Sequence, residues 1–478
     1  MKDKTLNRLL FFAIFLALAF YYCLIHPLVP FDTDDWMNMT TSRPLYPSLH
    51  CWNPTKVFPE RLEPAAAAVA ARFVAPIIGD YVNALILVNA IVISFFISLY
   101  LYLVQRLLTD RFRLSLPSSF CIVVLFALLH FLILKTKETG NDYLWYAEDC
   151  NCYYHYIVSN LLCACLVLWL MRSDVNKLMK GWRAIVLVIV SYFALCSNLY
   201  STVILVAYIG AKLVYELIAY GKKEYKWFGS YIKNNSYCLV VLFLWLVVQL
   251  IEVNGIRANA YGHVDDSLWE YIQLSTQNLL ALQFNVGVII FFVLVLLGAK
   301  AYHTHAEHHS IIHIGKQQSI LILASILSLL YLILLSSKVK PENMLKGQIV
   351  FSWAFFLLLL TILCFCYLCS KIKWFRCLLP LFLFLLVFNI RNVKSDFLGV
   401  QCLWGTTEYE CIEKNRDIIN QVRIAEALGQ DSVVIKVPKF EYKDNWPLAF
   451  DCGFTVGYTL RKHVVVRRHL KTSFSLEE

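Results

Sequence analysis

"LLFFAIFLALAFYYCLIHPL", residues 9–28, is the first of many long apolar runs in the chain. A helix of about 20 mostly apolar residues crosses a hydrocarbon layer about 30 Å thick. The run follows Lys2, Lys4 and Arg8, as the core of a signal peptide would, but it lacks a small-residue cleavage site and further apolar runs follow it. We therefore predict that it is retained as a membrane anchor.

The composition indicates that the whole chain belongs to a membrane. Its 478 residues are 59% hydrophobic and only 16% charged, whereas a soluble protein carries roughly 25% charged residues. The predicted fold class is an all-α polytopic membrane protein with about 11 transmembrane helices. The predicted spans are 9–28, 82–108, 116–134, 153–171, 183–198, 200–220, 236–254, 282–300, 318–336, 347–369 and 377–393.

The charges of the loops predict the orientation, because cytoplasmic loops carry an excess of Lys and Arg. With the N-terminus in the cytoplasm, the basic loops fall inside. The loops that then fall outside, which carry most of the Asp and Glu residues that precede the tail at 394, are 29–81, 135–152, 255–281 and 337–346. An odd number of spans places the C-terminal tail outside as well. The net charge of +10 follows from this topology and requires no nucleic acid partner.

Two domains are predicted from these boundaries. Residues 1–393 form the transmembrane domain, with a long first outer loop at 29–81 and a second at 135–152. Residues 394–478 form a small extracytoplasmic α+β tail, with a helix at 407–428, a stop at Gly429 and a strand at 432–437. We interpret the tail as a lid or packing module.

The first outer loop opens with "FDTDDWMNMTTSRPLY", residues 31–46, which places three carboxylates at the edge of the membrane. One interpretation is a solvated loop start in which Asp34 or Asp35 caps a short helix. The other is a catalytic cluster, in which Asp34 or Asp35 deprotonates an acceptor hydroxyl and Asp32 supports it or binds substrate. Trp36 could stack on a sugar, although Trp also favours the membrane interface.

Several bases lie on the outer side, where topology alone would keep bases few. Their non-catalytic interpretation is that they pair with nearby acids or lipid phosphates. Together they would suit a donor whose leaving group is a phosphate, because charge develops on that group as the bond breaks. The bases concerned are Arg43, Lys56, Arg61 and Arg72 in the first outer loop and Lys338, Lys340 and Lys346 in a later one.

The second outer loop combines acids with aromatic residues. Trp145 and Tyr153 flank Glu148 and Asp149. The aromatic residues suit an interfacial belt, and the acids suit the binding of sugar hydroxyls or a second catalytic role. We expect the two outer loops to meet at one cavity.

No soluble-nucleotide chemistry is indicated, because the chain lacks a phosphate-binding glycine loop, a G-x-S-x-G elbow and a dinucleotide fingerprint. The histidine-rich stretch at 303–313 lacks the fixed pattern of zinc enzymes and falls in a predicted inside loop. We assign no metal ligands. A divalent cation held by the outer carboxylates remains an open alternative.

The arrangement resembles the GT-C class of integral membrane glycosyltransferases. The shared features are a short cytoplasmic N-terminus, one span, a long outer loop opening with an acidic pair ("FDTDDW") and many further spans. Among them, bacterial proteins related to O-antigen glucosyl transferases are the most similar, and "LWYAEDCNCYY" resembles their second outer loop, with Asn151 and Tyr153 separated by Cys152.

The resemblance implies an enzyme of the bacterial inner membrane. Such an enzyme transfers a sugar from a polyprenyl-phosphate carrier to a cell-envelope glycan or lipid acceptor at the outer face. The base would be Asp34 or Asp35, and Arg43, Arg61 or Lys340 would meet the carrier phosphate. The alternative is a transporter or flippase for lipid-linked saccharides, although the span interiors hold few ionisable residues.

Overall fold

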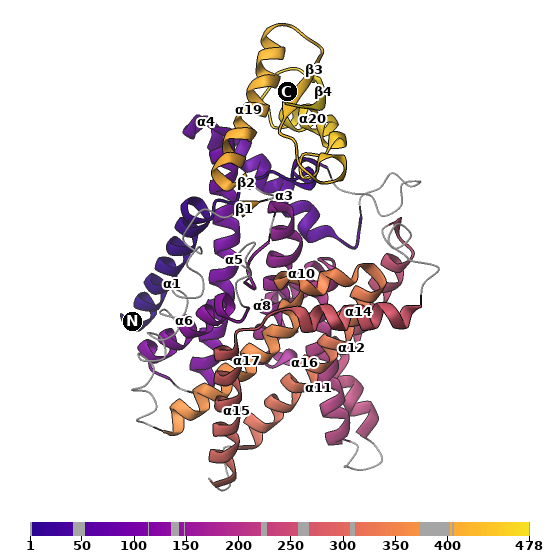
Figure 1. Cartoon of the computed structure of the whole chain (residues 1–478). Coiled ribbons are helices and arrows are strands. Elements are labelled where there is room, and N and C mark those ends of the chain that lie inside the picture. The colour runs from indigo at the N-terminus through magenta and orange to yellow at the C-terminus, as the bar shows by residue number, and fades with distance from the viewer. Residues whose placement is uncertain are drawn as a thin grey trace.

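The computed structural model describes residues 2–41, 53–112, 114–134, 143–147, 149–220, 227–256, 267–305, 311–372, 402–403 and 406–477. These residues form a helical, multi-pass membrane protein (Figure 1). Within them, seven helical segments are long and apolar enough to cross a membrane and three shorter ones are apolar. The predicted span at 377–393 lies outside the described residues.

The ten apolar segments coincide with ten of the predicted spans. The long ones are α1 (Lys2–Phe20) with η1 (Tyr21–Ile25), α5 (Tyr81–Phe112), α7 (Cys150–Cys152) with η4 (Tyr153–Val158) and α8 (Ser159–Arg172), α11 (Leu199–Tyr220), α12 (Trp227–Val253), α16 (Ile311–Val339) and α17 (Gly347–Lys371). The shorter ones are α6 (Leu116–Leu132), α10 (Trp182–Leu195) and α15 (Val286–His305).

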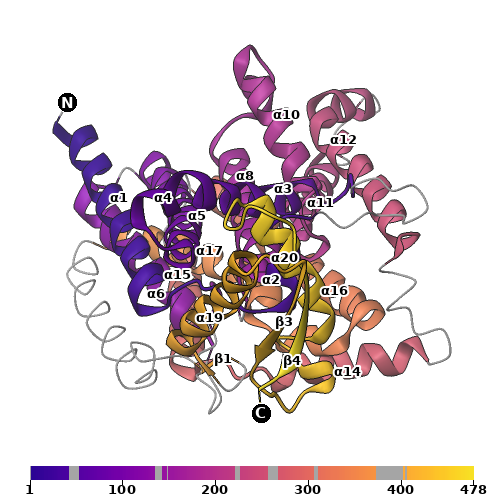
Figure 2. The same cartoon turned by 90° about the horizontal axis from the view of Figure 1, so that it is seen from above.

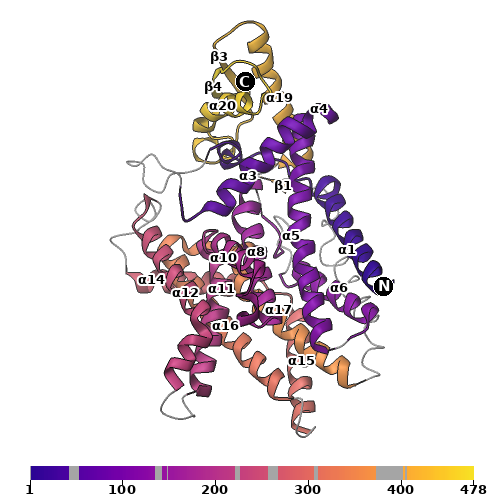
Figure 3. The same ribbon diagram turned by 180° about the vertical axis from the view of Figure 1, so that it is seen from behind.

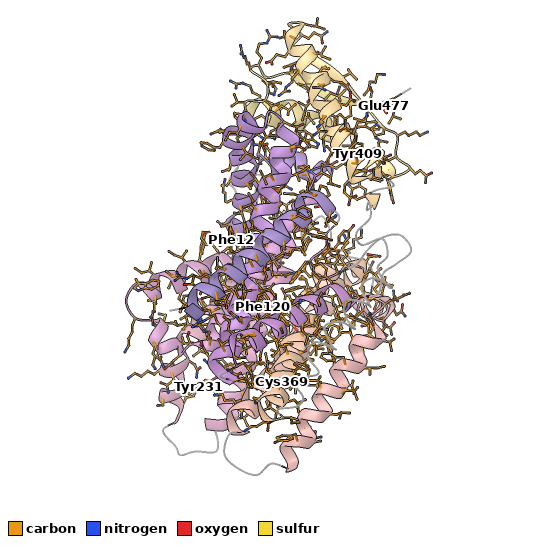
Figure 4. All side chains as sticks on the ribbon, turned by 90° about the vertical axis from the view of Figure 1, so that its left-hand side faces the viewer. Phe12, Phe120, Tyr231, Cys369, Tyr409 and Glu477 are labelled. Atoms are coloured by element: carbon orange, nitrogen blue, oxygen red, sulfur yellow. The ribbon has the colours of Figure 1, made fainter. Side chains whose placement is uncertain are left out.

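The helices differ in how far the rest of the protein encloses them. Among the 18 consecutive residues that form the most apolar part of each helix, 89% are buried within the protein in α17, against 17% in α1. Phe12 on α1 is 56% exposed and lies on the outside of the bundle (Figure 4). Helix α17 is therefore a central helix, whereas α1 presents its apolar side chains to the surrounding lipid.

The loops separate into two groups at the two ends of the bundle. At one end, Phe58 N donates to Cys196 O at 3.1 Å and Asn343 Nδ2 donates to Tyr200 Oη at 2.9 Å. We call this the cap end, because the C-terminal residues cover it (Figure 1). At the opposite end, Lys316 pairs with Glu216 at 3.3 Å, and Figure 3 shows α15 reaching away from the cap. The segments joined by these contacts thus lie at two opposite ends of the bundle, and which end is cytoplasmic stays a prediction.

Short helices occupy much of the cap end. Helix α2 (Thr33–Asn38) with its N-cap Asp32 holds the acidic stretch, which we define as Asp32, Asp34 and Asp35. One continuous helical segment follows, made of α3 (Val57–Val69), η3 (Ala70–Val74) and α4 (Ala75–Ile78). It ends at Gly79, whose φ of +80° turns the chain. The segment begins well before Pro64, which lies inside α3. Helix α14 (Leu268–Ala281) occupies part of the predicted outer loop at 255–281 and packs against α16 and η5 (Pro341–Leu345). Helix α9 (Val175–Leu178) lies between α8 and α10.

The C-terminal residues form a compact α+β unit, the cap module (residues 406–477). Its elements are β2 (Thr406–Thr407), which pairs with β1 (Cys402–Leu403), then α19 (Glu408–Ala427), β3 (Ser432–Val437), η8 (Lys443–Asn445), η9 (Phe450–Cys452), α20 (Gly453–Lys462) and β4 (Lys471–Leu476). The predicted helix and strand correspond to α19 and β3, with Gly429 between them at φ +75°. Strands β3 and β4 pair in parallel.

Two glycines let α20 lie directly on β4. A Cβ at Gly457 would come within 2.2 Å of Leu470 O, and one at Gly453 within 2.5 Å of Phe474 N. No larger residue fits this approach, because real Cβ atoms do not come closer than about 3 Å to backbone. This packing on β4 fixes the position of α20, the helix of the cap module that contacts α2.

The cap module and the first outer loop share one hydrophobic core. Phe31, Trp36 and Tyr81 belong to the same buried cluster as Ile418 and Leu460 of the cap module. Seen from above, the cap module lies over α2 (Figure 2). Because the apolar side chains of both parts are buried together, removing one part would expose the core of the other.

Polar contacts also join the cap module to the membrane domain. Thr33 donates to Pro447 O through its N–H at 3.0 Å and its hydroxyl at 2.7 Å. Arg416 pairs with Asp80 at 2.8 Å, just before α5 begins. The acidic stretch therefore lies between the helical bundle and the cap module.

Candidate functional site

Helix α2 is a single short helix that begins with a capping box. Asp32 is the N-cap, and its Oδ1 accepts from Asp34 N at 2.7 Å. Asp35, three residues further on, accepts from Asp32 N at 3.1 Å. This reciprocal pairing satisfies N–H groups that the start of a helix leaves without partners. The N-cap is therefore Asp32, not Asp34 or Asp35, because the helix begins at Thr33, two residues earlier than an Asp34 cap and three earlier than an Asp35 cap would require.

Asp35 joins the two outer loops. Its carboxylate is fully buried, and Oδ1 accepts from Asn151 N in the second outer loop at 2.7 Å. Asn38 Nδ2 donates to Asn151 Oδ1 at 2.9 Å. The expected meeting of the two outer loops is confirmed by these contacts.

Acidic side chains from three segments gather around this junction. They are Asp32, Asp34 and Asp35 of the acidic stretch, Glu63 of α3 and Asp149 at the N-cap of α7, and we call them the carboxylate cluster. The cluster is dense enough that each acid alters the ionisation of its neighbours.

Burial and mutual repulsion raise the pKa of four of these acids. Burial, then the charges of Asp149 and Asp35, raises the pKa of Asp32 to about 9. Burial and the Asp149 charge raise the pKa of Asp35 to about 7, against the lowering effect of its backbone partners. Burial raises the pKa of Asp149 to about 6, and burial followed by the Asp35 charge raises that of Glu63 well above its usual value. Asp32 is therefore protonated at neutral pH.

Asp34 differs from Asp32 and Asp35 in being only partly buried. Its charge contributes to the raised pKa of Asp32, Asp149 and Glu63, which places its carboxylate among theirs. Asp34 is thus the most accessible acid of the acidic stretch and remains in contact with the rest of the cluster.

The raised pKa of Asp32 predicts how stability depends on pH. The native state binds more protons than the unfolded state between pH 3.8, where an ordinary aspartic acid titrates, and about pH 9, so stability falls as pH rises through this window. Asp32→Asn keeps an acceptor for Asp34 N and cannot ionise. We expect the variant to gain about 1 to 3 kcal/mol over the parent at pH 8 relative to pH 4, measured by thermal unfolding at both pH values. An equal difference at both would contradict the assignment.

A base lies beside the cluster. The charge of Lys346, the N-cap of α17, lowers the pKa of Asp149. Lys346 is exposed and follows η5 in the predicted outer loop at 337–346. The sequence marks it as an outer base but does not indicate that it lies against the second outer loop, because that contact depends on how α17 packs.

Of the other predicted bases within the described residues, Lys56 is buried at the N-cap of α3, whereas the rest lie at the surface. Arg61 of α3 is exposed, as are Lys338 and Lys340 around the start of η5. No contact described in this part of the chain places Lys338 or Lys340 against an acid of the cluster. Arg43 and Glu148 lie outside the described residues.

The predicted aromatic residues are buried. Trp36 is 1% exposed and packs in the core shared with the cap module. Trp145 is fully buried and stacks on His130, with ring centroids 4.5 Å apart. In this conformation neither ring presents an open face to a sugar, since other side chains cover both.

Tyr153 takes part in a buried chain of polar groups that the sequence does not reveal. Its hydroxyl lies 2.9 Å from His26 Nε2, and His26 Nδ1 lies 3.0 Å from Glu408 Oε1. All three side chains are about 2% exposed. These three side chains link the first span, the span that follows the second outer loop, and the cap module, so they hold the cap module in register over the carboxylate cluster.

A small enclosed cavity adjoins the cluster. It has room for about one water molecule, about 10 Å³, and its lining includes Glu63, Asn89 and Tyr154. Glu63 Oε2 has no hydrogen-bond partner among the described residues, while Tyr154 donates to Asn89 Oδ1 at 2.7 Å. The cavity is polar and of the size that a bridging water needs.

The described residues contain no group of three or more His, Cys, Asp or Glu side chains arranged to hold a metal ion. In the carboxylate cluster, most oxygens of Asp35 and Asp32 already accept backbone N–H groups. The histidine-rich stretch at 303–313 has its side chains outside the described residues.

The chain matches no protein-family model, no curated protein and no solved structure.

Proposed function

We propose that the protein is a membrane glycosyltransferase that takes a sugar from a polyprenyl-phosphate carrier and transfers it to a cell-envelope glycan or lipid at the cap end. The observation that carries this proposal is the carboxylate cluster, in which acids from two outer loops and α3 meet beside Lys346. A carboxylate next to a cation suits transfer from a phosphate, because one group accepts a proton while the other meets the charge of the leaving group.

The proposal assigns the base to Asp34. Asp35 is buried and both of its oxygens accept backbone N–H groups. Asp32 has a pKa of about 9 and is already protonated at neutral pH. Asp149 accepts from Cys152 N through Oδ1 and also hydrogen-bonds to the Cys152 side chain. Asp34 is the most accessible acid of the acidic stretch, so an acceptor hydroxyl would reach it.

The proposed step is a single displacement that inverts the sugar. The acceptor hydroxyl oxygen forms a bond to the anomeric carbon while its proton passes to Asp34. The bond between that carbon and the carrier phosphate oxygen breaks, and the electron pair leaves with the phosphate. Lys346 offsets the charge that develops on the phosphate. The cap end would then face away from the cytoplasm of a bacterial inner membrane.

The proposal is tested with the purified full chain, a labelled polyprenyl-phosphate sugar and envelope glycan or lipid acceptors. Formation of a labelled product bond would support it. Movement of the labelled carrier across a vesicle membrane with no product would overturn it in favour of the lipid-linked saccharide transporter that the sequence leaves as the alternative.

Lys346→Gln tests the role of the cation. Because Lys346 would stabilise the leaving phosphate, we expect the transfer rate to fall about 10- to 100-fold. Lys371→Gln is the matched control, since Lys371 is exposed at the far end of the same helix, α17, and should change the rate less than about twofold. Equal losses in both variants would contradict the assignment.

A further inference from the structure

A second polar pocket lies at the end of the bundle opposite the carboxylate cluster. Its volume is about 250 Å³, and it is bounded by the ends of α5 and α8, the start of α9, and parts of α11 and α16. Tyr231 and Cys369 mark the same end in Figure 4, far from Tyr409 and Glu477 of the cap module. We call it the basic pocket. Its charged lining residues are Arg111, Lys212, Lys316, Asp174 and Glu216.

Two of the three acids of this region form ion pairs. Glu216 pairs with Lys316 at 3.3 Å, and Asp174 Oδ1 accepts from Asn176 N at 3.0 Å as the N-cap of α9. Asp110, at the end of α5, pairs with Arg172 and lies 3.7 Å from Arg106. The ion pairs therefore offset Glu216 and Asp110, and Asp174 is the acid of the lining that no ion pair within the described residues offsets.

Two bases of the basic pocket, Arg111 and Lys212, have N–H groups that no described carboxylate accepts. Arg111 Nη2 donates to Met171 O at 3.3 Å, and within the described part of the chain it pairs with no carboxylate. Lys212 is partly buried and forms no ion pair with any described residue. A guanidinium can present two parallel N–H groups to a phosphate, and a nearby ammonium adds a point charge.

The rest of the lining suits an ester with an apolar part. Tyr208 and Ser173 supply hydroxyl groups beside the bases, whereas Leu170, Val175 and Ile320 supply apolar surface. The pocket also lies where four membrane helices end, so a lipid could reach it with its headgroup while its chains stay in the bilayer.

We propose that the basic pocket binds a phosphate ester, held by Arg111 and Lys212, at the face opposite the proposed transfer site. The phosphate belongs either to an anionic lipid headgroup or to a small soluble phosphate ester, since both present the same anion. The proposal does not rest on glycosyl transfer, because it concerns a different end of the molecule.

Binding is measured on the purified full chain with two probes. Native mass spectrometry reports dioleoyl phosphatidic acid, and calorimetry reports glycerol 3-phosphate. We expect saturable binding of at least one probe. Binding of phosphatidic acid alone would identify a lipid headgroup, and binding of glycerol 3-phosphate would identify a soluble ester. Saturable binding of neither probe would overturn the proposal.

The double variant Arg111→Gln with Lys212→Gln tests the assigned residues. Loss of two charge-assisted contacts should weaken binding about tenfold or more. Lys177→Gln is the matched control, because Lys177 is an exposed base on the neighbouring α9 that does not line the pocket. An equal loss in this control would show that net charge alone attracts the probe and would overturn the assignment.

A measurement on the unaltered protein avoids any folding defect of the double variant. Lysine acetylation is followed by peptide mass spectrometry with and without the probe that binds. The probe should protect Lys212 at least about threefold more than Lys177, since only Lys212 would be covered. Equal protection of the two lysines would overturn the proposal.

Discussion

Asp34→Asn is expected to lower the rate of sugar transfer by about 10²- to 10⁴-fold, the usual contribution of a general base. The amide keeps the size of the side chain but cannot take a proton from the acceptor hydroxyl. Because Asp34 is only partly buried, the variant should fold and accumulate in membranes as the parent does. The rate is measured with labelled polyprenyl-phosphate sugar, and the protein level is measured in the same membranes.

Asp431→Asn is the control for this loss. Asp431 lies on the cap module with its side chain 99% exposed, so the variant should retain the parent rate within about twofold. An Asp34→Asn variant that transfers sugar at the parent rate would remove Asp34 from the mechanism. A loss that follows a matching fall in protein level would indicate a structural role instead.

The membrane-spanning helices were predictable because each depends mainly on a local property. An apolar run such as 347–369 must form a helix in lipid whatever its neighbours are, and α17 spans Gly347–Lys371. The charges of short segments predict which loops face the cytoplasm, and that orientation stays a prediction. The grouping of loops at two ends follows from these two local properties.

Long-range contacts account for what the sequence did not indicate. Strand β4 (Lys471–Leu476) is short, and its partner in the parallel sheet, β3, lies far earlier in the chain. Because the pairing is long-range, no local sequence pattern predicts the strand. In the sequence, Glu63 is one acid of a predicted outer loop. In the structure, α3 packs its side chain against the cluster, where it is only 4% exposed. His26 likewise gains its role only when Glu408 of the cap module comes within 3.0 Å.

One distinction within the site could have been made from sequence. Asp32 and Asp35 are three residues apart at the start of a short helix, which is the spacing of a capping box. That spacing assigns Asp35 to the helix start and leaves Asp34 on a different side of the first turn. The remaining evidence, the contact of Asp35 with Asn151 N, needed the structure.

Asp35→Asn is expected to destabilise the cap end, not merely to slow catalysis. Asp35 Oδ2 accepts from Phe31 N at 2.8 Å and Asp32 N at 3.1 Å, while Oδ1 accepts from Asn151 N at 2.7 Å. An asparagine has one acceptor oxygen, so either orientation turns its NH₂ group toward a backbone N–H. Each buried N–H left without an acceptor costs about 1–3 kcal/mol, and the loss should appear as a lower temperature of thermal unfolding.

The comparison of Asp35 with Asp34 separates positioning from proton transfer. Asp417→Asn is the stability control, since Asp417 is half-exposed on α19 and forms its ion pair with nearby Lys414 of the same helix; it should change stability by less than about 0.5 kcal/mol. If Asp35 positions the outer loops, the transfer rate of Asp35→Asn per folded molecule should recover at low temperature, where the fold persists. A fully stable Asp35→Asn protein with no transfer activity would instead move the base from Asp34 to Asp35.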